Sequence, residues 1–142
     1  MSVKTILRGK GGDLFTMPPH ATLQTVAEEL AKRRIGALLI MEGGHLAGIL
    51  SERDLVRVIA REGPGVLSSP ASSAMTAKVE TCTIDDSIHD VMSRMTASRF
   101  RHMPVVEDGR LVGVISIGDV VKERIEEAER ERDDMQAYIH SV

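Results

Sequence analysis

The 142-residue sequence is poor in aromatic side chains and in cysteine. Aromatic residues make up only 2% of the chain, although 42% of it is hydrophobic. The core of such a protein must therefore come from Val, Ile, Leu, Ala and the eight Met. A single cysteine, Cys82, excludes an internal disulfide and a cysteine-based metal cluster.

The sequence also lacks an excess of positive charge and a long apolar run. The formal net charge is −3, so no basic footprint argues for a nucleic acid partner. No run of about 18 apolar residues could span a membrane, and Met1–Lys10 lacks the apolar stretch of a signal peptide. The histidines are scattered without the spacing of a zinc site. These absences indicate a soluble cytoplasmic protein without a metal centre.

What the chain does contain is one phrase that occurs twice. The phrase is Gly, two apolar residues, Ser, two free positions, Asp and an apolar residue, and it occupies Gly48–Leu55 and Gly113–Val120. A shift of 65 residues that superposes the two copies also aligns Arg34 with Arg99, without a gap over this stretch. Such self-similarity indicates duplication of one supersecondary unit of roughly fifty residues.

Each copy predicts the order strand, helix, strand, strand, helix. In the first copy, residues 13–17 predict a short strand that is stopped by two prolines. Thr22 and Ser87 are the expected N-caps of the following helices, because apolar residues then recur at helical spacing. Hairpins are expected over 37–50 and 103–115, with glycine in their turns. A second helix should begin at the Ser of each repeated phrase.

The composition also predicts where the units begin and end. A stretch rich in Gly, Pro and Ser separates the copies and is expected to be a linker. The expected division is an N-terminal lead 1–12, a first unit 13–62, a linker 63–75, a second unit 76–128 and a helical tail 129–142.

The last helix carries a narrow apolar stripe into this tail. The stripe residues fall at alternating three- and four-residue steps, with Arg132 in the one gap, and are Val121, Ile125, Ala128, Met135 and Ile139. Such a stripe is typical of a helix that packs on a partner helix. It therefore predicts a homodimer, and a solvated tail with a chance stripe is the alternative.

The Ser-x-x-Asp part of the repeated phrase has two interpretations. The Ser is the expected N-cap and the Asp lies in the first helical turn, which is a plain capping box that needs no ligand. A helix N-terminus also offers unpaired N–H groups and a positive dipole end to a phosphate. A carboxylate beside it can accept hydrogen bonds from two vicinal hydroxyls. The repetition favours the second interpretation.

At this point the residues resemble a stand-alone pair of CBS motifs, the arrangement named a Bateman module. The resemblance rests on the doubled phrase, on the order of the elements and on Arg101–Val106 at the start of the second hairpin, and it covers about residues 13–128. It implies an α+β fold, in which two β-α-β-β-α units pack with pseudo-twofold symmetry and leave two clefts. Dimerisation is usual in the family.

The resemblance further implies a non-catalytic regulatory module that binds an adenosine nucleotide, AMP, ADP or ATP, and signals to a partner protein in trans. An NAD(H) or S-adenosylmethionine sensor and a structural dimer with empty clefts are the alternatives. No cofactor is required for such a role. An enzyme is disfavoured because no pairing of a nucleophile with a base emerges from the sequence.

Roles for individual residues also follow from the resemblance. The motif aspartates would accept hydrogen bonds from ribose hydroxyls, and the motif serines would face ribose or phosphate. Basic residues at the hairpin start would hold phosphate, and the first strands would line the adenine. An arginine inside the first phrase could reach a phosphate, although a surface arginine is the simpler outcome. The predicted ligand-binding residues are Ser51, Asp54, Arg53, Thr16, Thr81, Arg101, His102, Ser116 and Asp119.

The two sites are expected to be unequal. The 65-residue shift places Gly36 and Ala37 opposite Arg101 and His102, and neither of the first pair can supply a cation. Charge-assisted contacts contribute about 1.5 to 3 kcal/mol each. A phosphorylated ligand such as AMP should therefore prefer the second site.

Two further candidates carry weaker signals. Lys10-Gly11-Gly12 could approach a phosphate, but it lacks the Gly-Lys-Ser/Thr ending of a P-loop. Cys82 lies beside the first strand of the second copy, and no activating partner is near it in the sequence. We expect this cysteine to belong to the core.

Overall fold

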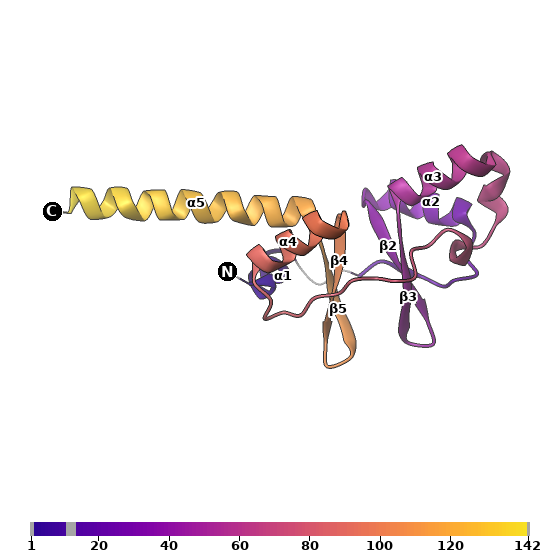
Figure 1. The fold of residues 1–142 in the computed structure, drawn as a ribbon, viewed down its shortest axis with the longest axis horizontal. Helices are drawn as coiled ribbons and strands as arrows, with labels where there is room; N and C mark the ends of the chain where they lie inside the picture. Colours follow the sequence, from indigo (N-terminus) through magenta and orange to yellow (C-terminus); the bar gives the residue numbers. More distant parts are fainter. Residues whose placement is uncertain (1, 11–13, 142) are drawn as a thin grey trace. The chain divides into compact units, whose positions relative to one another are not determined.

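A computed structural model describes residues 2–10 and 14–141, and the chain divides into two compact units (Figure 1). The first-motif unit is Asp13–Glu80. The second-motif unit joins Met1–Gly12 to Thr81–Val142. The N-terminal segment therefore belongs to the second copy of the repeat, although it precedes the first copy in the sequence.

The first-motif unit follows the predicted order of elements. It contains β1 (Thr16–Met17), α2 (Leu23–Arg33), β2 (Ala37–Glu42), β3 (His45–Ser51), α3 (Glu52–Glu62) and the 3₁₀ helices η1 (Pro64–Ser68) and η2 (Ala71–Ser73). In its sheet, β2 lies between β1, to which it is parallel, and β3, to which it is antiparallel. The strand predicted over 13–17 is shorter than expected, since only Thr16 and Met17 form it before Pro18. Asp13 lies outside the described residues.

The second-motif unit has the same order, with one reduced element. It contains α1 (Val3–Lys10), α4 (Ile88–Ser98), the hairpin of β4 (His102–Glu107) and β5 (Arg110–Ser116), and α5 (Ile117–His140). The expected first strand is reduced to one parallel bridge between Cys82 and Val105. The Cys82 backbone N–H donates to the Pro104 carbonyl at 3.0 Å, and the Val106 N–H donates to the Cys82 carbonyl at 2.8 Å.

Each unit has its own hydrophobic core of aliphatic, Met and Cys side chains. The buried residues of the first-motif unit are Leu23, Val26, Leu30, Leu38, Ile40, Leu50, Leu55, Val58, Val66 and Ala71. Those of the second-motif unit are Val3, Ile6, Cys82, Ile88, Val91, Met95, Met103, Val105, Ile115 and Val120. The segment expected to be a linker thus supplies Val66 and Ala71 to one core, and the segment expected to be a lead supplies Val3 and Ile6 to the other.

The helix ends explain why the elements begin and stop where they do. Thr22 and Ser87 are N-caps, as predicted, since their hydroxyl oxygens accept the backbone N–H groups of Thr25 at 3.2 Å and Asp90 at 3.0 Å. At the other ends of α2 and α4, the aligned Arg34 and Arg99 adopt left-handed backbone angles, with φ of 54° and 59°. This conformation ends a helix and is normally left to glycine.

The glycine of the repeated phrase allows another segment to approach each hairpin closely. A Cβ atom on Gly48 would lie 2.7 Å from the Met75 sulfur and 2.8 Å from the Thr76 carbonyl oxygen. A Cβ atom on Gly113 would lie 2.6 Å from a methyl carbon of Leu7 on α1. Both glycines are therefore required for packing, but the covering segments differ.

Candidate ligand-binding site

Both Ser-x-x-Asp phrases form complete capping boxes where a strand runs into a helix. Ser51 caps α3: its hydroxyl accepts the Asp54 N–H at 3.2 Å, and its own N–H donates to Asp54 Oδ2 at 2.9 Å. Ser116 caps α5 in the same way, with distances of 3.1 Å and 2.8 Å to Asp119. The capping interpretation is thus confirmed for both copies, and it leaves a second role for these side chains open.

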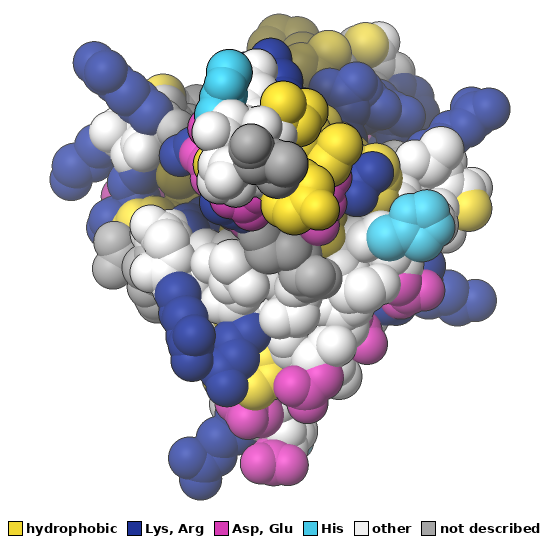
Figure 2. All heavy atoms as spheres, turned by 90° about the vertical axis from the view of Figure 1, so that its left-hand side faces the viewer, with side chains coloured by type: hydrophobic (Ala, Val, Ile, Leu, Met, Phe, Trp, Pro, Cys, Tyr) yellow, Lys and Arg dark blue, Asp and Glu magenta, His cyan; other side chains and the backbone are white. Residues whose placement is uncertain are grey.

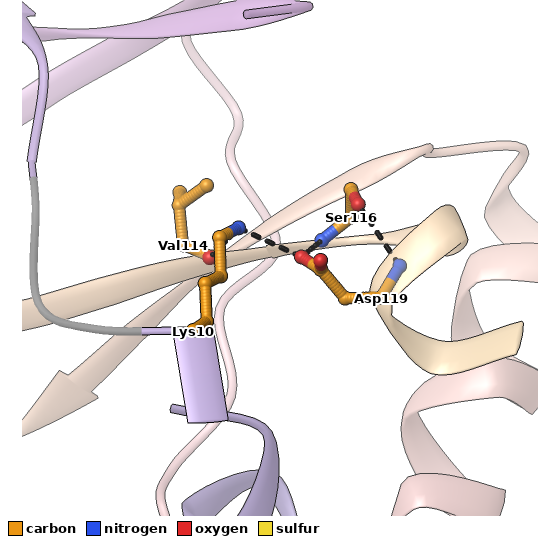
Figure 3. A network of polar contacts seen from close by, with 4 residues as sticks. All are labelled: Lys10, Val114, Ser116 and Asp119. Atoms are coloured by element: carbon orange, nitrogen blue, oxygen red, sulfur yellow. Dashed lines mark hydrogen bonds and ion pairs between the residues drawn. The ribbon is translucent and has the colours of Figure 1, made fainter. Parts of the chain in front are cut away.

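At the N-terminus of α5 the capping aspartate has an additional partner (Figure 3). Lys10, the last residue of α1, places its Nζ atom 2.7 Å from Asp119 Oδ2 and donates a hydrogen bond to the Val114 carbonyl at 2.8 Å. The side chains of Lys10 and Asp119 remain 36% and 25% exposed. An ammonium group and a carboxylate therefore lie side by side at a helix N-terminus, within reach of solvent.

The surroundings of Asp119 keep it ionised. Burial by itself raises the pKa of this carboxyl, but the hydrogen bonds from Lys10 and Ser116 and the charge of Lys10 outweigh burial, so that its pKa lies below the ordinary value. The bonds from the Lys10 ammonium and the Ser116 N–H both end on Oδ2. The other oxygen, Oδ1, takes part in neither bond and can accept a hydroxyl group of a ligand.

Arg101 and His102 lie at the same helix end. The Arg101 carbonyl accepts the Ile117 N–H at 2.8 Å. His102 pairs directly with Ser116 across the hairpin, so their side chains share one face. The side chain of Arg101 is exposed and that of His102 is half-buried. The second-motif unit therefore places Lys10 on Asp119 and brings Arg101 and His102 to the same strand–helix junction.

The first-motif unit has the same backbone geometry without these charges. The Gly36 carbonyl accepts the Glu52 N–H at 3.0 Å, and Ala37 pairs with Ser51. These are the positions that the 65-residue shift aligns with Arg101 and His102. Arg53 is exposed in the first turn of α3, as an arginine on a surface would be.

Neither of the two threonines predicted to mark the adenine subsites is part of a capping box. Thr16, on β1, pairs with Leu39 on β2. The strand β2 therefore separates Thr16 from β3, which carries Ser51. Thr81 precedes the bridge at Cys82, and its carbonyl accepts a hydrogen bond from an Arg94 guanidinium nitrogen at 2.6 Å. Their role in binding stays a prediction.

Cys82 is a core residue, as expected. Its side chain is buried, and burial, with Asp86 nearby, raises the pKa of the thiol to about 12. The thiol therefore stays protonated at neutral pH and is a poor nucleophile.

Within residues 2–10 and 14–141 no group of His, Cys, Asp or Glu side chains could hold a metal ion. In the same ranges, no helix is long and apolar enough to cross a membrane.

Lys10 is the candidate site residue that reasoning from the sequence underrated. A P-loop was the wrong pattern to compare it with, because the lysine acts from the end of a helix that packs on β5. The useful signal was the repeat itself. The 65-residue shift continues back beyond the strand and brings Lys10 onto Met75 and Gly48 onto Gly113. Lys10 and Met75 thus both precede a motif and both lie over the hairpin of the unit that contains them.

The repeated fold and the two capped strand–helix junctions define a module built from two copies of one unit. The family model of the CBS domain matches residues 6–61 and 71–126, two ranges with the same 65-residue offset. The chain therefore belongs to the CBS-domain family, and it contains two CBS domains.

Three comparisons illustrate the likeness. The CBS domain-containing protein CBSX3, mitochondrial, of Arabidopsis thaliana is 31% identical over 97% of this chain and 71% of the relative. The crystal structure of the CBS-domain containing protein ATU1752 from Agrobacterium tumefaciens is 42% identical, with a TM-score of 0.85 over 87% of this chain and 99% of that one. The CBS domain protein PAE2072 from Pyrobaculum aerophilum, solved in complex with AMP, is 30% identical, with a TM-score of 0.74 over 84% and 89%. CBS-domain proteins are generally regulatory, non-catalytic modules, and none of these three is named as an enzyme.

Proposed function

We propose that this chain is a non-catalytic regulatory module that binds an adenosine nucleotide of the AMP, ADP and ATP class and signals to a partner protein in trans. The observation that carries the proposal is the contact of Lys10 with Asp119 at the N-terminus of α5. It places a cation and a hydroxyl acceptor at the positive end of the α5 dipole. Support also comes from the AMP complex of the related PAE2072.

The ribose and the phosphate of a nucleotide each have a chemical counterpart at this junction. Asp119 Oδ1 is free of the bonds that Lys10 and Ser116 make to Oδ2, and it would accept a ribose hydroxyl. The Lys10 ammonium and the positive end of the α5 dipole would attract phosphate oxygens. The exposed guanidinium of Arg101 would provide a planar fork for the same oxygens.

The charges discriminate between the candidate ligands. Three basic groups favour an anionic ligand over S-adenosylmethionine, whose sulfonium group is a cation. NAD(H) carries phosphates and is the stronger alternative. The junction at Ser51 lacks equivalents of these basic groups among the described residues, and it would accept an uncharged ligand or a dinucleotide with less dependence on phosphate charge.

Calorimetry with AMP, ADP, ATP, adenosine and S-adenosylmethionine tests the proposal. AMP should bind at least about tenfold more tightly than adenosine, since one charge-assisted contact contributes about 1.5 kcal/mol or more. Mass spectrometry of small molecules released from the purified protein identifies the ligand it carries. Absence of binding to every adenosine compound would favour a structural dimer with empty sites.

Two controls address function beyond binding. Chromatography of each nucleotide after incubation with the protein should return it unchanged, and turnover would make the protein an enzyme. Asp119→Asn keeps the shape of the cap while it weakens the hydroxyl acceptor. If this variant melts earlier but binds AMP as well as the wild type, Asp119 only caps α5.

Cytoplasmic localisation stays a prediction, and the related CBSX3 is mitochondrial by its name.

A further inference from the structure

The C-terminal half of α5 makes no contact that buries it among the described residues. α5 spans Ile117–His140 and continues past α4 and α1 (Figure 1). Every residue from 128 to 140 is exposed. A helix as short as the exposed part, residues 128–140, is marginal in water by itself. Helices of fewer than about 12 to 15 residues form too few hydrogen bonds to offset the cost of nucleation. A partner for this part of α5 would explain its stability.

One side of α5 carries exposed apolar side chains toward both ends of the helix, with Arg132 between them. Four large apolar side chains of this stripe are between 44% and 64% exposed: Val121, Ile125, Met135 and Ile139. Together with Ala128 and Arg132 they recur at alternating steps of four and three residues. Figure 2 shows hydrophobic side chains gathered on one side of the helix end that faces the viewer. The spacing is that of a seam between two helices, in which each apolar residue inserts between residues of the partner.

The charge of α5 restricts what this stripe can bind. The helix carries eight acidic and four basic side chains. An anionic membrane surface would repel such a helix, which removes the lipid interface as an occupant. Arg132 occupies the gap in the stripe. The partner must therefore place a small residue opposite this arginine and an acidic residue beside it.

We propose that α5 pairs with α5 of a second copy of this chain in antiparallel orientation. In a parallel pair each Arg132 would face Arg132 of the second copy across the seam, which is repulsive. In an antiparallel pair with its twofold axis near residue 130, Arg132 lies opposite Ala128 of the second copy. Ala128 is small enough to leave room for the guanidinium, and Glu131 of the second copy lies beside it.

The remaining positions match in the same register. Val121 lies opposite Ile139 of the second copy, and Ile125 lies opposite Met135, so every large apolar residue of the stripe has an apolar counterpart. On the flank, Arg124 meets the exposed ring of Tyr138, a pairing that favours a cation over an aromatic face. Like charges approach only near the centre, where Glu129 lies beside Glu129 of the second copy and Glu131 beside Glu131 of the second copy. Both Arg132 side chains supply positive charge there.

Association of the full chain tests the surface. The wild type should be a dimer at micromolar concentration by sedimentation equilibrium. Met135→Glu with Ile139→Glu should weaken the dimer at least about a hundredfold, because four apolar side chains per dimer lose their burial. The matched control is Ala137→Glu with His140→Glu, which adds the same two residues off the stripe and should change the dissociation constant by no more than about threefold. A monomeric wild type, or a dimer indifferent to the first variant, would overturn the proposal.

A distance measurement tests the orientation. A spin label on His140→Cys should report about 30 Å between copies in the antiparallel pair, since 20 helical residues separate residue 140 from its counterpart, residue 120. A parallel pair would give roughly 10 Å, the usual distance between packed helix axes. Cys82 is buried and does not compete for the label. The short distance would reject the antiparallel arrangement even if the stripe is the interface.

Discussion

The two units derive from one repeated sequence, yet different segments cover their hairpins. In the first-motif unit the backbone at Thr76 bonds to Ile49 in both directions, at 3.0 Å and 2.9 Å, and Met75 lies over Gly48. In the second-motif unit α1 takes this place, with Leu7 over Gly113 and Lys10 on Asp119. The comparison teaches that the repeated phrase itself supplies only a cap and a packing glycine. The chemistry that distinguishes the two copies comes from residues outside it.

The largest expected difference between the units concerns the packing glycines. Gly48→Ala should lower the free energy of unfolding by about 3 kcal/mol, because the added methyl group meets the Thr76 carbonyl oxygen in a paired backbone that cannot move easily. Gly113→Ala should cost about 1 kcal/mol, because the Leu7 side chain can rotate away. Urea denaturation measures the free energy of unfolding of both variants. An equal decrease would show that the backbone at Thr76 adjusts to the added methyl group as easily as the Leu7 side chain does.

The second difference is the cation over Asp119. Lys10→Met, which copies the residue at the equivalent position of the other unit, should weaken AMP binding about 10- to 100-fold by calorimetry. Arg8→Met is the matched control, because it removes one positive charge from the exposed side of the same helix. Unchanged or tighter binding by Lys10→Met would mean that the lysine competes with the ligand for Asp119 instead of holding its phosphate.

The basic residues at the start of β4 should contribute a smaller part of the asymmetry. Arg101→Ala with His102→Ala is expected to weaken AMP binding about tenfold while adenosine binding changes little, since the lost contacts are to phosphate. Arg110→Ala, at the exposed start of β5 beside the turn of the same hairpin, serves as the control. Equal affinity of the double variant and the wild type for AMP would leave these residues as a solvated strand edge.

The smallest effect is the pH dependence of stability that the Asp119 carboxyl group should contribute to the second-motif unit. The pKa of Asp119 is lowered in the folded protein, so its contribution is present above the ordinary Asp value of about 3.9 and is lost as the pH falls through the lower folded value. The difference in stability between wild type and Asp119→Asn should therefore shrink as the pH is lowered below about 4. Thermal melts across this range would contradict the expectation if the difference stayed constant.

The local parts of this structure could be predicted from the sequence. Alternating and helical spacing predicts the hairpins and helices, and Ser-x-x-Asp predicts the caps, because these depend on neighbours within four residues. The shift of 65 residues correctly placed Arg101 and His102 at the start of the second hairpin. These signals lie in the chain itself and need no knowledge of tertiary contacts.

The covering segments could not be predicted in the same way. Lys10 and Asp119 are far apart in sequence, and nothing local to either residue indicates the other. The short 3₁₀ turns of η1 and η2 contain Gly, Pro and Ser, which made a packed segment resemble a linker. In both cases long-range packing decides the outcome, since Val66, Ala71, Val3 and Ile6 are buried by the assembled cores of their units.

The position of α1 has a consequence for how the chain folds during synthesis. The ribosome produces α1 first, but the hairpin and helices against which Val3 and Ile6 pack follow the whole first-motif unit. At roughly 5 to 20 residues per second, α1 waits several seconds with its apolar side uncovered. The first-motif unit can complete its own core during this interval. A nascent chain halted after residue 80 should therefore expose α1 to chaperones and proteases beside a folded neighbour.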